Sequence, residues 1–193
     1  MNVPSIYRCI TENPEVVDIL GWPFDFEICE PFLLSNNWPI LLSKELVVLA
    51  EDGTGGAYTI LENIEPEKSP VVFLSSEGQA GMVAANLAEF IAVMVALPYW
   101  RDLLKFSASG KLSEMYKAVP FLKREELEDE PDIFSKKDVI YQALILPHLA
   151  DPVQTLFDSV MSGINIEINA TDGTPYEGLF NTFSVSDNKS WKR

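Results

Sequence analysis

The chain has 193 residues, 47% of them hydrophobic, and its 14 Lys and Arg against 29 Asp and Glu give a formal net charge of −15. This length suits one large domain, because domains commonly span about 50–250 residues. The negative charge opposes binding to nucleic acid or to anionic lipid through phosphate contacts. No apolar run reaches the roughly 20 residues that a membrane helix needs. We therefore expect neither nucleic acid nor a membrane as a partner.

The first 45 residues contain one clear helix signal. Asn13 can cap a helix that has Pro14 at its first position and stops at Gly21. Trp22-Pro23 and Trp38-Pro39 are predicted to be irregular, because a residue before proline is displaced from helical backbone angles. We expect the neighbouring apolar side chains to fill the core over the first strand, with a partner-binding surface as the alternative. These side chains are Phe24, Phe26, Phe32, Leu33 and Leu34.

A glycine-rich turn lies between two apolar segments. Residues 46–50 enter the turn, Glu51-Asp52-Gly53-Thr54-Gly55-Gly56 form it, and residues 57–61 leave it. Glycine tolerates positive φ, so the turn can reverse the chain, and the pattern predicts a β-hairpin. Residues 71–75 form a further strand candidate, which a turn from Glu77 to Gly81 follows.

A helix is predicted after that second turn. Asn86 can cap it, and Glu89 lies three residues further on, as in a capping box. Apolar residues recur on one face with i, i+3, i+4, i+7 and i+8 spacing. They are Leu87, Phe90, Ile91, Met94 and Val95. A helix with such a face, next to a sheet that needs covering, predicts an α+β layer arrangement.

The second half is predicted to be mainly helical. Helical spacing resumes at residues 99–106, and a further helix over 112–119 is expected to end at Pro120. Two more helices are expected within residues 135–161, separated near Asp151-Pro152. Beyond them, two segments alternate like a strand pair around a turn, and the final ten residues have no regular pattern. These segments are 164–168, 178–183 and 184–193.

An acid-rich run occupies residues 125–132, with six acids in eight positions. We interpret it as a solvated helix end or loop, with contact to a partner as the alternative. The excess of acids is larger in the first half of the chain. Residues 1–97 carry 14 acids and 3 bases. This excess of negative charge either serves solubility alone or, through its electric field, speeds the encounter with a basic protein.

No constellation of residues predicts catalysis or cofactor binding. His148 is the only histidine, and no nucleophile is evident that it would serve. With Cys9 and Cys29 it lacks zinc-ligand spacing, and we expect both cysteines to be reduced thiols. Glu51 and Asp52 precede the glycine turn, which opens into a strand, so a phosphate cradle is excluded. Residues 1–8 lack a secretion signal, which predicts a cytoplasmic protein.

The order of these elements resembles the SUKH superfamily, which contains yeast cell-wall assembly regulators and many bacterial immunity proteins. The matching motifs are an acidic-Gly-x-Gly loop before an aromatic strand, Pro70-Val71 before Phe73, and the helix that Asn86 caps. They lie within residues 40–97, and Ala57 departs from the asparagine that relatives often carry. Residues 98–193 have no counterpart. The structural signature consists of Gly53, Gly55, Gly56, Tyr58, Phe73 and Phe90.

The resemblance implies one α+β domain over residues 1–193: a curved, mainly antiparallel sheet flanked by helices, with a helical C-terminal elaboration. It implies no enzymatic activity, no metal and no cofactor, but an immunity protein that neutralises a basic secreted toxin, such as a nuclease. An intracellular scaffold is the alternative, and a carboxylate hydrolase is a third class. The hypothesis for partner binding is an acidic face. Its members are Glu51, Asp52, Glu62, Glu65 and Glu77.

Overall fold

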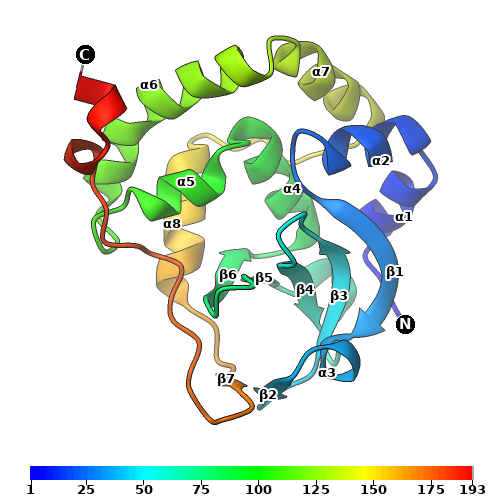
Figure 1. The fold of residues 1–193 in the computed structure, drawn as a ribbon. Helices are drawn as coiled ribbons and strands as arrows, with labels where there is room; N and C mark the ends of the chain where they lie inside the picture. The colour runs from blue at the N-terminus through cyan, green and yellow to red at the C-terminus, as the bar shows by residue number, and fades with distance from the viewer. Residues whose placement is uncertain (193) are drawn as a thin grey trace.

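A five-stranded antiparallel sheet organises the computed structural model, which describes residues 1–192. Its strand order is β1-β3-β4-β5-β6, so every strand from β3 onward lies beside the next one along the chain (Figure 1). The strands are β1 (Glu27–Leu33), β3 (Leu46–Glu51), β4 (Ala57–Leu61), β5 (Val71–Leu74) and β6 (Ala80–Ala84). A smaller sheet pairs β2 (Ile40–Leu42) with β7 (Ile168–Ala170). The predicted α+β class with an antiparallel sheet is confirmed.

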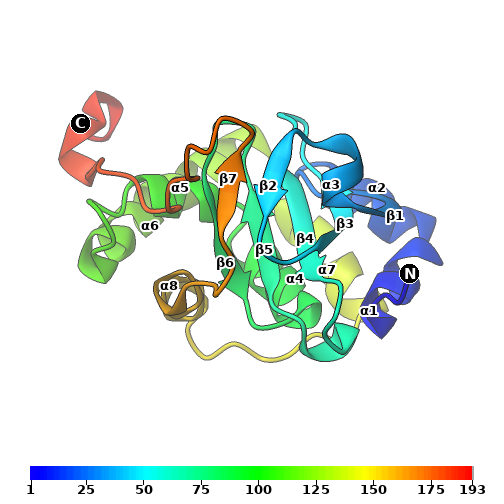
Figure 2. The same ribbon diagram turned by 90° about the horizontal axis from the view of Figure 1, so that it is seen from below.

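Helices cover one face of the large sheet, and the small sheet with α3 covers the other (Figure 2). Helices α6 and α7 arch over α5 and α4 and reach α2 (Figure 1). The helices are α1 (Ser5–Thr11), α2 (Pro14–Gly21), α3 (Leu34–Asn37), α4 (Leu87–Ala96), α5 (Trp100–Lys105), α6 (Leu112–Asp129), α7 (Ile133–Ala143) and α8 (Pro152–Ser162). The predicted helical C-terminal region is thus present as α6, α7 and α8.

Tyr58 lies at the centre of a buried aromatic cluster. Its ring centroid lies 4.9 Å from that of Phe26, 5.1 Å from that of Phe73 and 5.3 Å from that of Phe90. Trp100 completes the cluster, with its ring centroid 6.3 Å from that of Tyr58. Aromatic side chains bury more area than other residues, so strands β4 and β5, helices α4 and α5, and the segment before β1 are joined in one core.

The glycine turn has the predicted hairpin geometry, with β3 and β4 paired in antiparallel register. The Asp52 carboxylate folds back into the turn and accepts hydrogen bonds from the Thr54 N–H at 2.9 Å and the Gly56 N–H at 2.7 Å. Gly55 has a φ of +84°, which favours glycine. The turn is therefore organised around an internal acceptor.

The predicted starts of α2 and α4 are confirmed. Asn13 accepts a hydrogen bond from the Val16 N–H at 3.3 Å, and Asn86 accepts one from the Glu89 N–H at 3.0 Å. The Glu89 carboxylate accepts from the N–H of Ala85, at 2.8 Å. In a capping box the Glu89 carboxylate would accept from the N–H of Asn86, so the observed donor lies one residue earlier in the chain.

The prediction that a helix ends at Pro120 is wrong, because α6 continues through it to Asp129. Proline lacks one N–H and crowds the preceding turn, which costs about 3 kcal/mol. The buried side chains of Met115, Ala118 and Leu122 on both sides of Pro120 hold the helix against the core. Tertiary burial outweighs the local cost. Most of the acid-rich run therefore lies on the last turns of α6.

The predicted strand pair near the C-terminus is also wrong. Residues 168–170 pair with β2, from the other half of the chain, and residues 178–183 form no strand. Leu179 is buried and would contact a Cβ at Gly81, so this segment is fixed by packing beside β6. Trp191, in the tail that showed no pattern, is buried and stacks on Phe121 with ring centroids 5.0 Å apart. Alternation alone did not distinguish a strand from a packed irregular segment.

The N-terminal aromatic segments divide between core and surface. Phe24, Phe26 and Leu34 are buried as expected, whereas Trp22 has 70% of its surface exposed. None of the helices within residues 1–192 combines the length and the apolarity that crossing a bilayer requires.

Replacing Gly56 by alanine is expected to destabilise the fold. An added Cβ would meet Asp52 Oδ2 at 2.6 Å and the Leu74 carbonyl oxygen at 3.0 Å, and overpacking of this kind costs about 1–3 kcal/mol. Gly21→Ala is the matched control, because a Cβ there meets nothing within 4 Å and alanine favours helix. Urea unfolding should give a lower midpoint for Gly56→Ala only. Equal midpoints would contradict the tight packing of the turn.

Candidate functional site

The five acids predicted to form one partner-binding face lie at two ends of the sheet. Glu51, Asp52 and Glu77 flank the β3–β4 and β5–β6 turns, which share one end because the strands are antiparallel. Glu62 and Glu65 follow β4 at the opposite end, and a strand of five residues separates its ends by about 15 Å. These acids therefore form no common face.

Asp52 is the buried central carboxylate of a partly buried ionic cluster that links three segments. Arg101, on α5, donates from Nη1 to Asp52 at 2.7 Å and from Nη2 to Asp25 in the loop before β1. The Asp52 side chain is only 1% exposed. Asp25 also accepts from the Gly53 N–H at 2.8 Å, and its carbonyl accepts from the Tyr58 hydroxyl at 3.0 Å. Asp52 thus links these three segments, and its carboxylate has almost no accessible surface.

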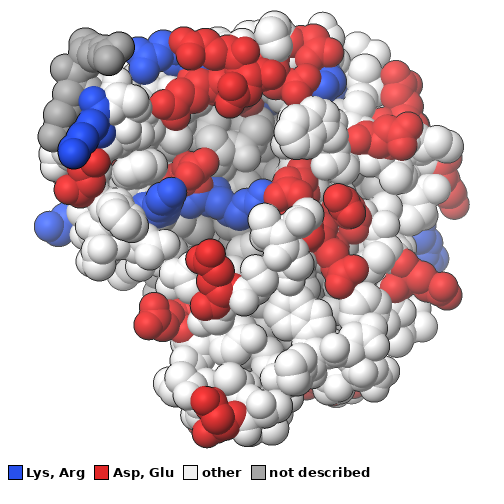
Figure 3. Space-filling view, viewed as in Figure 1, with Lys and Arg blue, Asp and Glu red and all other residues white. Residues whose placement is uncertain are grey.

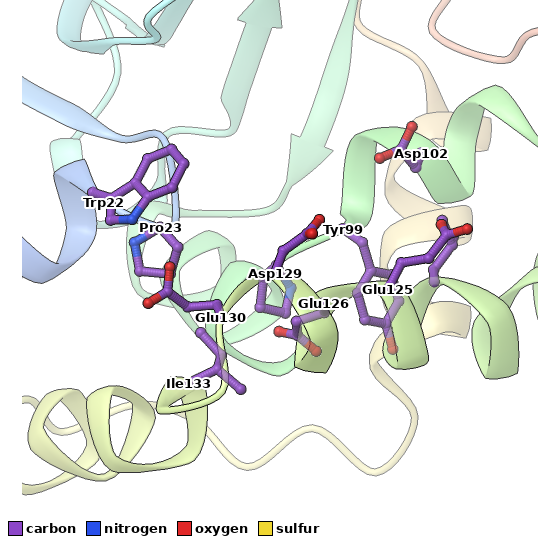
Figure 4. Close-up of a pocket in the computed structure, with 11 residues that line it drawn as sticks. Trp22, Pro23, Tyr99, Asp102, Glu125, Glu126, Asp129, Glu130 and Ile133 are labelled. Carbon is purple, nitrogen blue, oxygen red and sulfur yellow. The ribbon is translucent and has the colours of Figure 1, made fainter.

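A different concave surface gathers more acids. It lies between α6, α5 and the loop before β1, with a cavity volume of about 270 Å³ (Figures 3 and 4). We call it the acidic groove, and five of its eleven residues are acids. Its lining residues are Trp22, Pro23, Pro98, Tyr99, Asp102, Leu122, Glu125, Glu126, Asp129, Glu130 and Ile133. Other hollows are larger, but this one combines concavity with a single sign of charge.

Lysines of α7 pair with two of the groove's acids. Lys137 lies 3.1 Å from Glu126, and both side chains are largely buried. Lys136 lies 2.5 Å from Glu130. These pairs fasten the end of α6 to α7 and shape the wall of the groove. Much of the charge on Glu126 and Glu130 is therefore neutralised within the chain.

The remaining acids of the groove are more available to a partner. Within residues 1–192, the side chains of Asp102 and Asp129 make no hydrogen bond or ion pair. Glu125 accepts a hydrogen bond from Trp191 Nε1 at 2.5 Å. Desolvation of the carboxyl raises the pKa of Asp102 above its ordinary value, although the residue as a whole is exposed and Lys105 and Arg101 oppose this shift. The groove thus presents carboxylates that favour a neutralising cation.

Aromatic and apolar surface makes up the rest of the groove. Trp22 stands on one side with its indole exposed, opposite Asp102 and Tyr99 from the α5 side (Figure 4). Burial, together with the nearby charge of Glu126, raises the pKa of Tyr99 to about 12. Its phenol therefore stays neutral at physiological pH. Pro23 and Ile133 continue the apolar lining.

Sequence reasoning found parts of this site and missed its assembly. The acid-rich run was recognised, with partner contact as an alternative, and the segment around Trp22-Pro23 was considered as a surface. Nothing in the sequence distinguished Asp102 from other helical acids. Only the arch of α6 over α5 brings these segments together (Figure 1).

His148 lies outside the acidic groove. It is exposed in the segment between α7 and α8, where it lines a separate shallow hollow with Tyr141 and Leu146. In the part of the chain that the structure describes, no three His, Cys, Asp or Glu side chains are grouped to hold a metal ion. Cys9 and Cys29 are free thiols.

Arg101→Met should destabilise the protein by about 3 kcal/mol, because it leaves Asp52 as a buried carboxylate without its cation. Denaturant unfolding of Arg101→Met, Asp52→Ala and the double variant would measure the coupling between the two residues. We expect the double variant to be less destabilised than the sum of the single variants, by about 1–3 kcal/mol. Strictly additive effects would contradict a stabilising ion pair.

Asp102→Asn should stabilise the protein slightly at neutral pH; the gain is small because Asp102 is exposed and solvent screens its charge. The folded chain holds the Asp102 proton to higher pH than the unfolded chain does, so this residue lowers stability as pH rises through that range. The gain should disappear near about pH 3, where both states are protonated. The gain will be reduced because an acid in the first turn of α5 interacts favourably with the helix dipole, and the variant loses that interaction.

Unfolding of Asp102→Asn at the two pH values checks this expectation. Asp138→Asn, which removes an exposed acid of α7, is the control for the loss of one negative charge. A variant less stable than the parent at pH 7 would show that the groove does not disfavour the ionised Asp102.

Comparisons with family models, with curated proteins and with solved structures find no match to this chain. The likeness of residues 40–97 to the SUKH superfamily therefore stays a resemblance based on short motifs. The acidic groove and its chemistry provide the remaining basis for a function.

Proposed function

We propose that this chain is a non-enzymatic protein-binding module whose acidic groove receives a basic partner. One observation carries the proposal: Asp102 and Asp129 line a concave surface, and within residues 1–192 their side chains make no hydrogen bond or ion pair. The exposed indole of Trp22 lines the same surface. A cation entering the groove would therefore find carboxylates that are exposed and free to pair with it.

The field around the groove favours a basic protein over other ligands. Acidic side chains crowd the ridge above the hollow, with a band of basic residues below it (Figure 3). The charge of Arg101 on α5 is already compensated by Asp25 and Asp52. A net negative potential of this kind accelerates encounter with a positively charged surface and repels phosphate.

We further propose that the partner is a basic toxin domain, which the chain binds and neutralises in the cytoplasm as an immunity protein. The SUKH-like motifs in residues 40–97 support this identification, as does the antiparallel sheet flanked by helices. Enzymes that act on nucleic acid carry basic surfaces, which an acidic groove could cover. A scaffold of the same fold with a basic partner other than a toxin is the alternative.

A carboxylate hydrolase is the competing class, and the raised pKa of Asp102 beside Glu125 is the observation that favours it. Two features favour binding instead. Glu126 and Glu130 are held in ion pairs with lysines, and the groove is an open surface formed by three segments (Figure 4). A hydrolase would need a carboxylate placed against an enclosed substrate.

Affinity capture with the full chain from cells of its native host should recover a basic protein. Purified partner should then bind Asp102→Asn/Asp129→Asn about tenfold or more weakly than the parent, because charge partners at a desolvated contact are lost. Glu62→Gln/Glu65→Gln removes the same charge at the other end of the sheet and should bind as the parent does. Titration calorimetry at two salt concentrations measures these affinities.

The opposite ranking of the two double variants would overturn the groove as the binding surface. The toxin assignment has its own test, in which the captured protein is expressed in cells with and without this chain. If the captured protein arrests growth and this chain relieves the arrest, the immunity role is supported. If the captured protein is harmless, the scaffold role is supported instead.

A further inference from the structure

We infer that residues 181–191 form a detachable clasp, which holds the loop between α5 and α6 in a strained conformation and opens as a unit before the sheet unfolds. We call these residues the C-terminal clasp. They include the short 3-10 helix η2 (Val185–Asp187) and most of η3 (Lys189–Lys192), and they lie beside α6 (Figure 1). Such a device would operate whether or not the chain binds a basic partner.

Backbone hydrogen bonds anchor the start of the clasp to the α5–α6 loop. The Ala108 N–H donates to the Phe183 carbonyl at 2.7 Å. The Ser109 N–H donates to the Asn181 carbonyl, also at 2.7 Å. The Asn181 N–H donates in turn to the Leu104 carbonyl at 3.2 Å. The first anchor thus joins the clasp to residues 104–109 through main-chain groups.

One aromatic side chain anchors the other end of the clasp. The Trp191 ring centroid lies 4.5 Å from that of Phe106 and 5.0 Å from that of Phe121, and the Phe121 ring is stacked on it. Trp191 Nε1 also donates to the Glu125 carboxylate at 2.5 Å. The second anchor is therefore a slot between the end of α5 and the middle of α6, filled by a single indole.

Between the two anchors the clasp spans a hollow with a cavity volume of about 660 Å³. Most of the residues around this hollow are polar or charged. They are Ala108, Lys111, Glu114, Lys117, Thr182, Ser184, Val185, Ser186 and Trp191. Segments that bury few apolar contacts open at the lowest free energy. The middle of the clasp therefore adds little to the attachment that its two ends provide.

The loop under the clasp has a strained backbone. Ala108 has a φ of +47° and Ser109 a φ of +63°. Left-handed angles are disfavoured for residues with a Cβ, and they persist where the surrounding structure holds them. These two residues are the same two whose N–H groups donate to the clasp. Opening of the clasp would let the loop relax, and this relief lowers the free energy of the open state.

Release of the clasp would also change the acidic groove. Glu125 lines the groove and accepts the hydrogen bond from Trp191. In the open state Glu125 would lose this partner, and the rings of Phe106 and Phe121 would be uncovered. The clasp is thus a contact through which the chain restrains one acid of its own groove.

Amide hydrogen exchange of the full chain, followed by NMR at increasing urea concentrations, tests the inference. The informative amides are those of Ala108, Ser109 and Asn181, which donate across the first anchor. We expect them to exchange through a common opening with weak urea dependence, because little surface is exposed. Amides of β3, β4 and β5 should exchange through global unfolding, with strong urea dependence. The same strong dependence for both sets would overturn the clasp.

Two substitutions should shift this opening in opposite directions. Trp191→Ala removes the second anchor and should speed exchange of the Ala108 and Ser109 amides at least about tenfold. Trp22→Ala is the matched control, because it removes an indole that is 70% exposed, and it should leave these rates unchanged. Ser109→Gly relieves the strain and should slow exchange at Ala108 about threefold. Faster exchange in Ser109→Gly would contradict a strained loop.

A substitution in the sheet separates local opening from global unfolding. Ile60 lies in β4 and is 1% exposed, so Ile60→Val should speed exchange of the sheet amides about fivefold. The clasp and loop amides should keep the rates of the parent. Equal acceleration of both sets would overturn the clasp, and this result can be obtained even where Trp191→Ala does not fold. Either outcome leaves the proposed function to its own test with the captured partner.

Discussion

The ion pairs of Arg101 with Asp25 and Asp52 are the interaction on which the rest of this structure depends. They tie together the loop before β1, the glycine turn of the β3–β4 hairpin and helix α5. The two groove residues Trp22 and Asp102 lie on the same two segments, three residues before Asp25 and one residue after Arg101. A buried pair that fixes the fold therefore also fixes two walls of the candidate site.

The third wall comes from a separate set of charges. Lys136 and Lys137 on α7 hold Glu130 and Glu126 at the end of α6, and Trp191 holds Glu125 through its indole N–H. Three of the six acids in residues 125–132 are thus engaged in fixing the geometry of the wall. The acid-rich run is structural in part and available to a partner in part, which net charge alone could not reveal.

The sequence predicted those structural features that depend on interactions between residues close together in the chain. The Asn13 and Asn86 caps, the hairpin around Gly55 and the apolar face of α4 all depend on residues a few positions apart, and the structure confirms them. The pairing of β2 with β7, the passage of α6 through Pro120 and the presence of Trp22 and Asp102 in one groove depend on contacts between residues far apart in the sequence. Periodicity and spacing carry no information about such contacts.

Pro120 in helix α6 shows how a backbone position can influence a site that its own side chain does not line. The helix has 18 residues, a length of about 27 Å at 1.5 Å per residue, and it curves over α5 (Figure 1). Bends in helices concentrate at proline, where one backbone hydrogen bond is absent, and Pro120 lies midway along α6. The curved path of α6 brings its terminal acids to the same groove as Asp102 of α5, although Pro120 itself does not line that groove.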